Sequence, residues 1–547
     1  MSQVLSDLLF PNVKETKEDL LKRYPYREEG VVCTRLAPSP TGFLHIGGVY
    51  TALINRKMAT QNNGVFMLRI EDTDKKREVL GSRKIITNVF KELGIKIDEG
   101  VISETEEIGS YGPYVQSNRV DIYHVLAKYL VEKGLAYPCF ATEEELNEIR
   151  KAQEENHVTP GYYGKYAKYR DASIDTIKEL LAKGVPYVLR FRVSEDAPER
   201  VKVNDLIKGE LEMDNNQNDF VLLKTDGIPT YHFAHACDDF LMHTSHVIRG
   251  DEWVSSLPIH VQLFEALEFP LPNYAHVAPV MKQEGESRRK LSKRKDPESN
   301  AEFYLEKGYP AKALYVYLYT LINSNFEEWY LANKDKDIAE FEIKFENMGV
   351  SGPLYDLDKL NNISSEIIYE TNLDENVEKL LKWANEYDKD AYNRFTANID
   401  FVKKIFMTQG PNSRERRKDL KCYSNFMETF GFLYDDYFLA SSKKEVDVFV
   451  SQIGTERMNL VVNAYINYFT ELKDGKNEKS LKDLAKELGY TDKKKYQKNP
   501  EAYIGLFTEF YQILNLALSH KLNCISVDDV ISVLGFDEVI NRLKKVI

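Results

Sequence analysis

Hydrophobic residues follow two different patterns along the chain. Up to about residue 300, short apolar runs rich in β-branched residues alternate with longer stretches of helical character. Such alternation of strands and helices is typical of an α/β fold with a parallel sheet. We predict strands in five of these runs, which are VVCTRLA from Val31, VFMLRIED from Val65, PYVLRFRV from Pro186, DFVLLKTD from Asp219 and HVIRGDEW from His246.

Beyond about residue 300 the apolar positions follow the period of a helix. Ser480 can cap a helix, with Asp483 three residues on, and Gly489 can end it. One face of this helix carries Leu481, Leu484, Ala485 and Leu488. The segment from Ser526 to Gly535 repeats the design, so we predict an all-α C-terminal region.

Residues 111–215 interrupt the alternation in the first half. They are richer in Tyr, Lys and Glu, and the polar stretch MDNNQND follows at 213–219. An inserted α+β subdomain is the simplest interpretation of this change. Residues 1–29 precede the first predicted strand and form an appended arm.

Composition limits the class of protein. The 547 residues carry 73 Lys and Arg against 86 Asp and Glu, which gives a net charge of −13, and 43% are hydrophobic. That length suits several domains. No apolar run approaches the ~18 residues that a spanning helix needs. The first residues, MSQVLSDLLFPNVKETKEDL, lack the basic-then-apolar pattern of a secretory signal, so a soluble protein is expected.

The cysteines indicate the compartment. They are odd in number, scattered and without a CxxC pair. This arrangement argues against a disulfide framework and favours a reducing cytoplasm. The residues are Cys33, Cys139, Cys237, Cys422 and Cys524.

The segment TRLAPSPTGFLHIGGVYTALINRKMA, from Thr34, combines a strand, a turn and the start of a helix. Pro38 and Pro40 stop the strand, and Gly42 permits a turn before HIGG, from His45, opens the helix. Glycines at a helix start let a ligand approach the backbone, where free N–H groups attract phosphate. His45 adds a donor that can follow charge developing on a phosphate. For HIGG alone, an ordinary turn with an incidental histidine is the alternative.

A basic segment, SRRKLSKRKDP from Ser287, is the second candidate for chemistry. Six of the eight positions from 288 to 295 are basic. Such a run is commonly a solvated face or a nucleic-acid contact. The Gly and Ser before it indicate a mobile loop, which can close Lys290 and Lys293 onto a triphosphate. From this segment alone, both interpretations stay open.

These two segments, in this order, resemble the signatures of class I aminoacyl-tRNA synthetases. HIGG at 45–48 resembles the HIGH motif with Gly48 as its last residue, and KLSKR at 290–294 resembles the KMSKS loop. Further motifs extend the resemblance over about 30–375 and narrow it to the bacterial-type glutamyl-tRNA synthetases. They are RLAPSPTG at 35–42, RIEDTD at 69–74, GIPTYHFAH at 227–235, DDFLMHTSHVIRGDEW at 238–253 and GPLYDLDKL at 352–360.

The resemblance implies a Rossmann-type catalytic domain that activates L-glutamate with ATP, accompanied by Mg²⁺. Glutamate attacks the α-phosphate to give glutamyl-adenylate and diphosphate, and the tRNA 3′ end then takes the glutamyl group. The implied organisation is an N-terminal arm (1–29), two halves of the catalytic domain (30–110 and 216–300, the second with the KLSKR loop), an inserted acceptor-binding subdomain (111–215), a stem-contact helical domain (301–375) and a helical anticodon-binding domain (376–547).

The resemblance also implies roles for individual residues. Glutamate has two carboxylates and one ammonium, which two arginines and one acid complement. Arg35 and Tyr231 are expected to face the side-chain carboxylate, Glu71 the ammonium with Ser39 nearby, and Arg249 the α-carboxylate. The expected ATP-binding residues are His45, Gly47, Glu252, Lys290 and Lys293, and of these His45, Lys290 and Lys293 are the expected catalytic residues.

His235 departs from the family pattern, since many members have Asn at this position. An imidazole there could donate a hydrogen bond to glutamate, with a charge that depends on pH. A role for His235 in substrate binding is therefore a hypothesis.

A histidine-rich stretch invites a zinc interpretation, because His232, His235, Cys237, His243 and His246 lie close in sequence. Alternation along an expected strand would send His232 and His235 to opposite faces, which argues against it. In the inserted subdomain Cys139 has no neighbouring cysteine, although some relatives bind zinc there. We therefore expect no metal ligands and no structural zinc.

Net charge argues against a nucleic-acid partner, but it does not describe local patches. Beside 288–295, basic residues gather at 414–418 and at 493–498. They could grip tRNA phosphates, and Tyr496 could stack on a base, although solvated helix ends are an equal alternative. The expected partner is tRNA(Glu), with tRNA(Gln) left open, and the family favours a monomer. The clusters comprise Arg414, Arg416, Arg417 and Lys418, and Lys493, Lys494, Lys495 and Lys498.

Other functions fit the sequence less well. A non-discriminating enzyme that also glutamylates tRNA(Gln) stays open. APSPTG and the helical tail disfavour a glutaminyl enzyme, and the long tail disfavours a shortened tRNA-modifying relative. Length and the glutamate-binding set argue against a small nucleotidyltransferase. The presence of His45, Lys290 and Lys293 argues against a degenerate tRNA-binding module.

Overall fold

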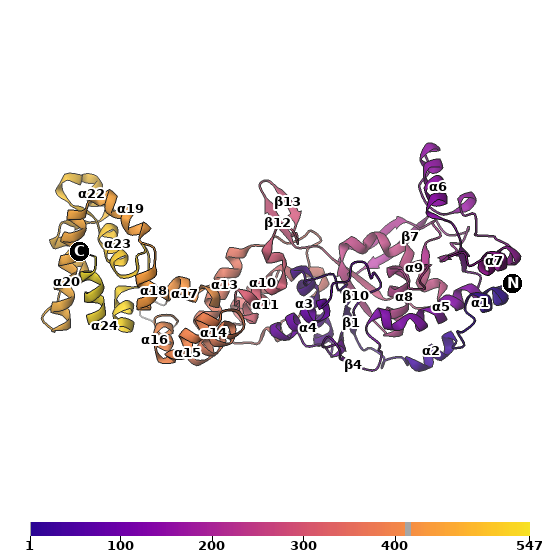
Figure 1. Ribbon diagram of the computed structural model, residues 1–547, viewed down its shortest axis with the longest axis horizontal. Coiled ribbons are helices and arrows are strands. Elements are labelled where there is room, and N and C mark those ends of the chain that lie inside the picture. Colours follow the sequence, from indigo (N-terminus) through magenta and orange to yellow (C-terminus); the bar gives the residue numbers. More distant parts are fainter. Residues whose placement is uncertain (1, 411–416, 547) are drawn as a thin grey trace. The chain divides into compact units, whose positions relative to one another are not determined.

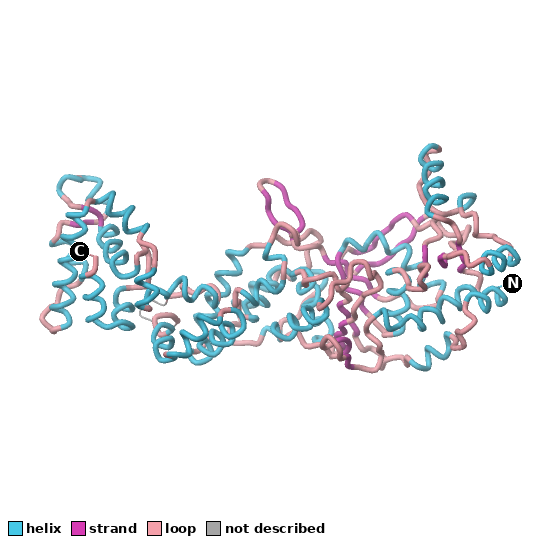
Figure 2. The backbone as a smooth tube through the Cα atoms, in the orientation of Figure 1, coloured by secondary structure: helices cyan, strands magenta, loops and turns pink. Residues whose placement is uncertain are grey.

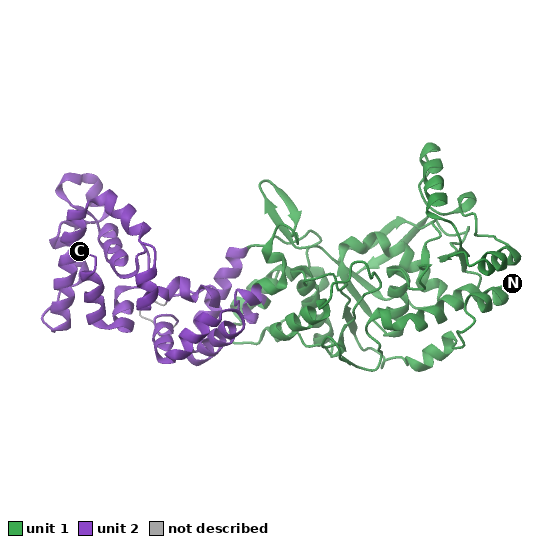
Figure 3. Cartoon of the chain, viewed as in Figure 1, with its two compact units in different colours: residues 1–303, 315–356 green, residues 304–314, 357–547 purple. Residues whose placement is uncertain are grey.

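The computed structural model describes residues 2–410 and 417–546, and the chain divides into two compact units (Figures 1 and 3). Unit 1 comprises residues 1–303 and 315–356, and unit 2 comprises residues 304–314 and 357–547. Most of the strands lie in unit 1, whereas unit 2 is largely helical (Figure 2). None of the described helices is both long and apolar enough to cross a bilayer.

Unit 1 is built around an eight-stranded sheet that is parallel except at its two edge pairs, β3–β4 and β7–β8. Thr34 pairs with Phe66 on one side and with His246 on the other, so the chain order reverses between β1 and β10. Ligands bind at such switch points in α/β sheets. The strand order is β4 (Glu107–Ile108), β3 (Glu99–Val101), β2 (Val65–Leu68), β1 (Cys33–Leu36), β10 (His246–Gly250), β11 (Asn273–Val277), β7 (Arg200–Asp205) and β8 (Gly209–Asp214).

Helices connect the parallel strands and bury the sheet. α3 (Ile46–Gln61) follows β1 and packs against β1, β2 and β10. His45 caps its first turn, and the chain turns at Asn63, which has a positive φ of 51°. The other helices of this region are α4 (Ser82–Leu93), α5 (Val120–Glu132), α8 (Tyr231–Leu241) and α9 (Leu257–Ala266).

The five strand predictions are confirmed, because β1, β2, β6 (Val188–Phe191), β9 (Val221–Leu223) and β10 lie within the predicted runs. The strand expected around His232 and His235 is wrong, since both residues belong to helix α8. Every residue of α8 from Phe233 to Leu241 is buried, so this stretch has no solvent-exposed face, and its polar residues lie inside the fold.

A separate three-stranded antiparallel sheet has the order β5 (Ala136–Cys139), β6 and β9. Two helices accompany it, α6 (Glu143–Glu155) and α7 (Ile174–Ala182), capped by Thr142 and Ser173. The strands of the two sheets do not divide at residue 215, the predicted end of the inserted subdomain. β9 joins the small sheet although it follows that limit, and β7 and β8 join the main sheet although they precede it. The domain limits stay a prediction.

The N-terminal arm packs on unit 1 through two helices, α1 (Ser2–Leu9) against α5 and α2 (Lys17–Arg23) after a capping box at Thr16. Arg27 donates two hydrogen bonds of 2.8 Å to Glu99 of β3. Lys17 contacts Glu268 at 2.9 Å. These pairs tie the arm to the residues just after α9 and to β3 of the main sheet.

A hairpin of β12 (Met281–Glu284) and β13 (Ser287–Lys290) carries the start of the basic segment. The prediction of a loop is therefore wrong for residues 287–290, because Gly285, with φ of 62°, turns the chain and lets both arms pair. Asp296 holds the base of the hairpin through Lys282 and Arg289. The helices that follow are α10 (Ala301–Glu306), α11 (Ala311–Ile322) and α12 (Phe326–Ala332).

Unit 2 packs its helices around one aromatic-rich core that includes Phe395, Phe426 and Phe510. Both predicted helices are confirmed: Ser480 caps α21 (Leu481–Glu487), and Ser526 caps α24 (Val527–Lys544), which kinks at Gly535. The other helices are α13 (Leu357–Glu370), α14 (Leu373–Tyr387), α15 (Lys389–Ala397), α16 (Ile399–Phe406), α17 (Phe426–Phe430), α18 (Asp435–Ala440), α19 (Lys444–Ile453), α20 (Thr455–Lys473), α22 (Lys493–Lys498) and α23 (Phe507–Ser519), beside a short pair of strands, β14 (Tyr490–Thr491) and β15 (Gly505–Leu506).

Candidate active site

A cavity of about 1260 Å³ opens at the carboxyl ends of β1, β2 and β10, where the strand order reverses. Residues that directly follow these strands reach it because parallel strands end at the same edge of the sheet. Ten residues predicted from the sequence line this cavity. They are Arg35, Ser39, His45, Gly47, Glu71, Tyr231, Arg249, Glu252, Lys290 and Lys293.

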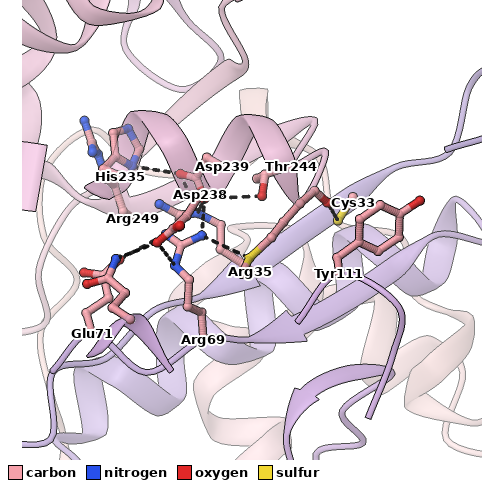
Figure 4. Close-up of polar contacts among 12 residues, drawn as sticks. Cys33, Arg35, Arg69, Glu71, Tyr111, His235, Asp238, Asp239, Thr244 and Arg249 are labelled. Carbon is pink, nitrogen blue, oxygen red and sulfur yellow. Dashed lines mark hydrogen bonds and ion pairs between the residues drawn. The ribbon is translucent and has the colours of Figure 1, made fainter. Parts of the chain in front are cut away.

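One side of the cavity rests on a buried cluster of arginines and carboxylates (Figure 4). Asp239 of α8 accepts from Arg35 Nε at 3.1 and 3.2 Å and from Arg69 Nη1 at 2.6 Å. Asp238 accepts from Arg119 Nε at 2.7 Å. Burial opposes ionisation of Asp239, but the two arginines outweigh it and hold its pKa well below the usual value. The ionised Asp239 thus fixes Arg35 through Nε, and Arg35 lines the cavity.

Glu71 provides a buried acidic group of the cavity. Its Oε1 accepts from Arg69 Nη2 at 3.0 Å, and the side chain is largely buried. Burial raises the pKa of Glu71, and the charges of Arg69 and Arg35 offset this rise only in part. A bound ammonium would add a further positive neighbour and favour the ionised carboxylate.

Arg249 lies at the end of β10 and is held by neutral groups. Its Nε donates to His276 Nε2 at 3.0 Å, and its two terminal nitrogens lie 3.2 Å from Tyr231 Oη and 3.1 Å from His260 Nδ1. Among the residues that the structure describes, no carboxylate lies within ion-pair distance of this guanidinium. Tyr231 in turn stacks on Trp253, with ring centroids 4.1 Å apart.

His235 does not line the cavity. It is fully buried beneath Tyr231, with ring centroids 5.9 Å apart, and lies 2.8 Å from Asp239 and 3.1 Å from Tyr274 Oη. Burial lowers the pKa of His235 to about 3, which favours a neutral ring, and its role in substrate binding stays a prediction. Its contacts support Tyr231 and Asp239 instead of reaching into the cavity.

The other end of the cavity combines a helix start with basic side chains. Gly47 N–H donates to His45 Nδ1 at 2.9 Å, so the ring proton lies on Nε2, which faces the Leu291 carbonyl at 3.3 Å. Burial lowers the pKa of His45, and this favours a neutral ring. Lys293 Nζ donates to the Phe43 carbonyl at 3.3 Å, and Lys290 lies 3.6 Å from Glu252. Backbone N–H groups, a neutral imidazole and two ammonium groups therefore face one space, which suits a polyphosphate.

The sequence pattern does not indicate the residues that lie beneath the cavity. Arg69 and Asp239 fall inside recognised motifs, but nothing in the sequence shows that these positions, 170 apart, form a pair. His260 and His276 gave no signal at all. Charged or imidazole side chains inside otherwise apolar stretches are the one feature that could have indicated them.

The histidines of the histidine-rich stretch contact different partners and do not converge on one point. His232 contacts His260 at 3.1 Å, whereas His243 contacts the Tyr24 carbonyl. Among residues 2–410 and 417–546, no group of three or more His, Cys, Asp and Glu is arranged to hold a metal ion. The absence of structural zinc stays a prediction.

Comparison with known proteins shows which family this chain belongs to. Residues 31–361 match the model of the family described as tRNA synthetases class I (E and Q), catalytic domain. The chain belongs to this family.

Relatives of this class I synthetase match along nearly its whole length. It is 42% identical to a glutamate–tRNA ligase of Clostridium perfringens, over 99% of this chain and 98% of that protein. It is 41% identical to the glutamate–tRNA ligase of Clostridium beijerinckii, over 99% and 98%. The crystal structure of a glutamate tRNA ligase from Elizabethkingia meningosepticum in complex with its amino acid is similar, with a TM-score of 0.72 and 27% identity over 94% of this chain and 99% of that one.

The two basic clusters of the helical region differ in what surrounds them. Arg414 and Arg416 lie outside the described residues, while Arg417 pairs with Asp419 at 2.7 Å and Lys418 pairs with Glu366. Lys493, Lys494, Lys495 and Lys498 are exposed on α22, with Tyr496 half-buried among them. All four α22 lysines are therefore exposed, whereas Arg417 is half-buried.

Proposed function

We propose that this class I synthetase is a glutamate–tRNA ligase. It activates L-glutamate with ATP to glutamyl-adenylate and diphosphate, and then transfers the glutamyl group to the 3′ end of tRNA(Glu). Its relatives carry this name over the full length of the chain. The observation that carries the proposal is the charge of the cavity.

Three arginines of the site, Arg35, Arg69 and Arg119, are matched by the carboxylates of Glu71, Asp238 and Asp239. Arg249 adds a fourth positive charge whose direct partners are neutral. Of these four guanidinium groups, Arg249 is thus the one without a directly paired carboxylate among the described residues, and a carboxylate of the substrate complements it. Glutamine lacks the side-chain carboxylate and would present a neutral amide to Arg35 in its place, which loses a charge-assisted hydrogen bond.

The geometry supports the individual roles that the resemblance implies. Arg249 and Arg35 bind the two carboxylates of glutamate, Tyr231 assists Arg35, and Glu71 accepts from the ammonium with Ser39 at the rim. Arginine suits these roles because its fork binds a carboxylate through two hydrogen bonds. His235 acts only through its neighbours.

ATP binds over the start of α3, with its phosphates between His45, Gly47, Lys290 and Lys293, and with Glu252 at the side. The neutral His45 donates from Nε2 to a phosphate oxygen as charge develops there, and both lysines stabilise the leaving diphosphate. Mg²⁺ would accompany the nucleotide and would neutralise charge on its phosphates.

The helical unit is proposed to bind tRNA, with the α22 cluster contacting phosphates. Charging of tRNA(Gln) with glutamate is the alternative activity that the charging assay below tests.

ATP–pyrophosphate exchange tests the proposal, measured with glutamate or glutamine and with or without tRNA. We expect exchange with glutamate and none with glutamine. Absence of exchange under every condition would refute the ligase assignment. Charging of purified tRNA(Glu) and tRNA(Gln) then decides between a discriminating and a non-discriminating enzyme.

A further inference from the structure

Two buried histidines that do not line the cavity lie directly behind Arg249. His276 comes from β11 and His260 from α9, and both are fully buried. Arg249 Nε donates to His276 Nε2 at 3.0 Å, and Arg249 Nη2 lies 3.1 Å from His260 Nδ1. A guanidinium has donors only, so both of these ring nitrogens must be unprotonated acceptors.

The proton positions in the whole chain of contacts follow from this constraint. His276 carries its proton on Nδ1 and donates it to Asp205 Oδ2 at 2.7 Å. His260 carries its proton on Nε2 and donates it to His232 Nδ1 at 3.1 Å. Each imidazole is thereby fixed in one tautomer by a partner on its far side.

We propose that His260 and His276 are positioning residues for glutamate binding: their unprotonated ring nitrogens accept two N–H groups of Arg249 and aim its remaining donors at the α-carboxylate of the substrate. This inference rests on the proposed role of Arg249. Neutral acceptors suit the task better than carboxylates, since a carboxylate in either place would form an ion pair with Arg249 and compete with the substrate.

The surroundings keep both rings neutral. Burial lowers the pKa of His276 and lowers that of His260 well below its usual value, with nearby charges such as Arg249 adding to the effect at His260. The other groups that face Arg249 are Tyr231 Oη and the ring of Tyr274, whose centroid is 5.0 Å from the guanidinium carbon. Asp205 is the nearest carboxylate along this chain of contacts, and it reaches Arg249 only through His276.

A crossed pair of substitutions tests the proposal, because Asn places its amide near the Nδ1 of a histidine and Gln places it near Nε2. His260→Asn and His276→Gln therefore keep an oxygen acceptor for Arg249. His260→Gln and His276→Asn are matched controls of the same chemistry that move the acceptor away. The measurement is the KM for glutamate in tRNA charging at saturating ATP and tRNA, together with the KM for ATP and the melting temperature.

We expect the two acceptor-keeping variants to stay within about three-fold of the parent, and the two controls to raise the KM for glutamate roughly ten-fold or more, as for one charge-assisted hydrogen bond. The KM for ATP should not change. A merely structural role would affect Asn and Gln alike at each position, so equal or reversed effects would overturn the proposal. Arg249→Lys distinguishes the role of Arg249 from the role of the histidines. An unchanged KM for glutamate in this variant would refute the role of Arg249 itself. A raised KM in this variant, together with equal KM values for the Asn and Gln variants at each histidine, would refute only the positioning.

Discussion

Glu71→Gln should move substrate affinity and stability in opposite directions. The side chain is 7% exposed, and burial raises the pKa of its carboxyl, so holding it ionised at neutral pH costs folding free energy. Glutamine has the same shape and keeps an oxygen for the 3.0 Å contact with Arg69. Arg69 also keeps its 2.6 Å ion pair with Asp239. We therefore expect the variant to be at least as stable as the parent at pH 7.

The loss in binding comes from the ammonium of glutamate, which would face a neutral amide. A charge-assisted hydrogen bond is worth about 1.5–3 kcal/mol, which corresponds to a rise of roughly 10- to 150-fold in the KM for glutamate. The KM for ATP should stay unchanged because Glu71 lies at the opposite end of the cavity from Lys290 and Lys293.

The pH dependence of stability gives a second measurement. A carboxyl whose pKa is raised on folding binds its proton more tightly in the folded state, so its contribution is fully present below the ordinary pKa and is lost as the pH rises through the raised value. The stability curves of parent and variant, from urea unfolding, should converge below about pH 4.5 and separate above it. A variant less stable by several kcal/mol at pH 7, or an unchanged KM for glutamate, would refute the reasoning.

Three further predictions concern the buried cluster, the basic hairpin and the α22 lysines. Asp239→Asn should lower the free energy of unfolding by about 3–5 kcal/mol, because it removes the carboxylate that pairs with two buried arginines. Asp436→Asn, at an exposed pair with Arg394, should lower it by less than about 1 kcal/mol. Equal losses in urea unfolding would contradict this prediction. Lys293→Ala should lower kcat for ATP–pyrophosphate exchange about 10²-fold or more. A change confined to the KM for ATP would mean that Lys293 binds the nucleotide without stabilising the transition state. Replacing all four α22 lysines with Gln should weaken tRNA binding and reduce the slope of log affinity against log salt by up to ~0.9 per lost phosphate contact, and an unchanged slope would exclude this helix from the tRNA surface.

Local sequence patterns predict an element correctly where that element has a distinctive hydrophobic period or a distinctive boundary. β1 and β10 are short apolar runs between polar turns, and α21 has a capping serine, an apolar face and a terminal glycine. The pattern failed for α8, which is buried on nearly every side and rich in aromatic and histidine residues. It also gave no sign that β7 and β8 return to the main sheet, since that depends on the pairing of Asp205 with Tyr274.

The candidate site was predictable as far as its motifs reach. Lys290, Arg249 and His45 belong to segments with a recognisable sequence, and all three line one cavity. The groups behind them were not predictable, because the roles of Asp239 and His276 arise from contacts with residues far away in the chain. The depth of His235 was not predictable for the same reason, since its place in a family motif does not show that it lies buried beneath Tyr231.

The pairing of β1 with β10 has a consequence for synthesis of the chain. Thr34 pairs with His246, so more than two hundred further residues must be translated before β1 can pair with β10 at the centre of the sheet. At 5–20 residues per second this interval lasts on the order of 10–40 s. The small sheet β5–β6–β9 has all its strands within that interval and can form on the ribosome while one edge of β1 is still open. We expect nascent chains released before β10 to expose that edge and to depend on chaperones or to aggregate.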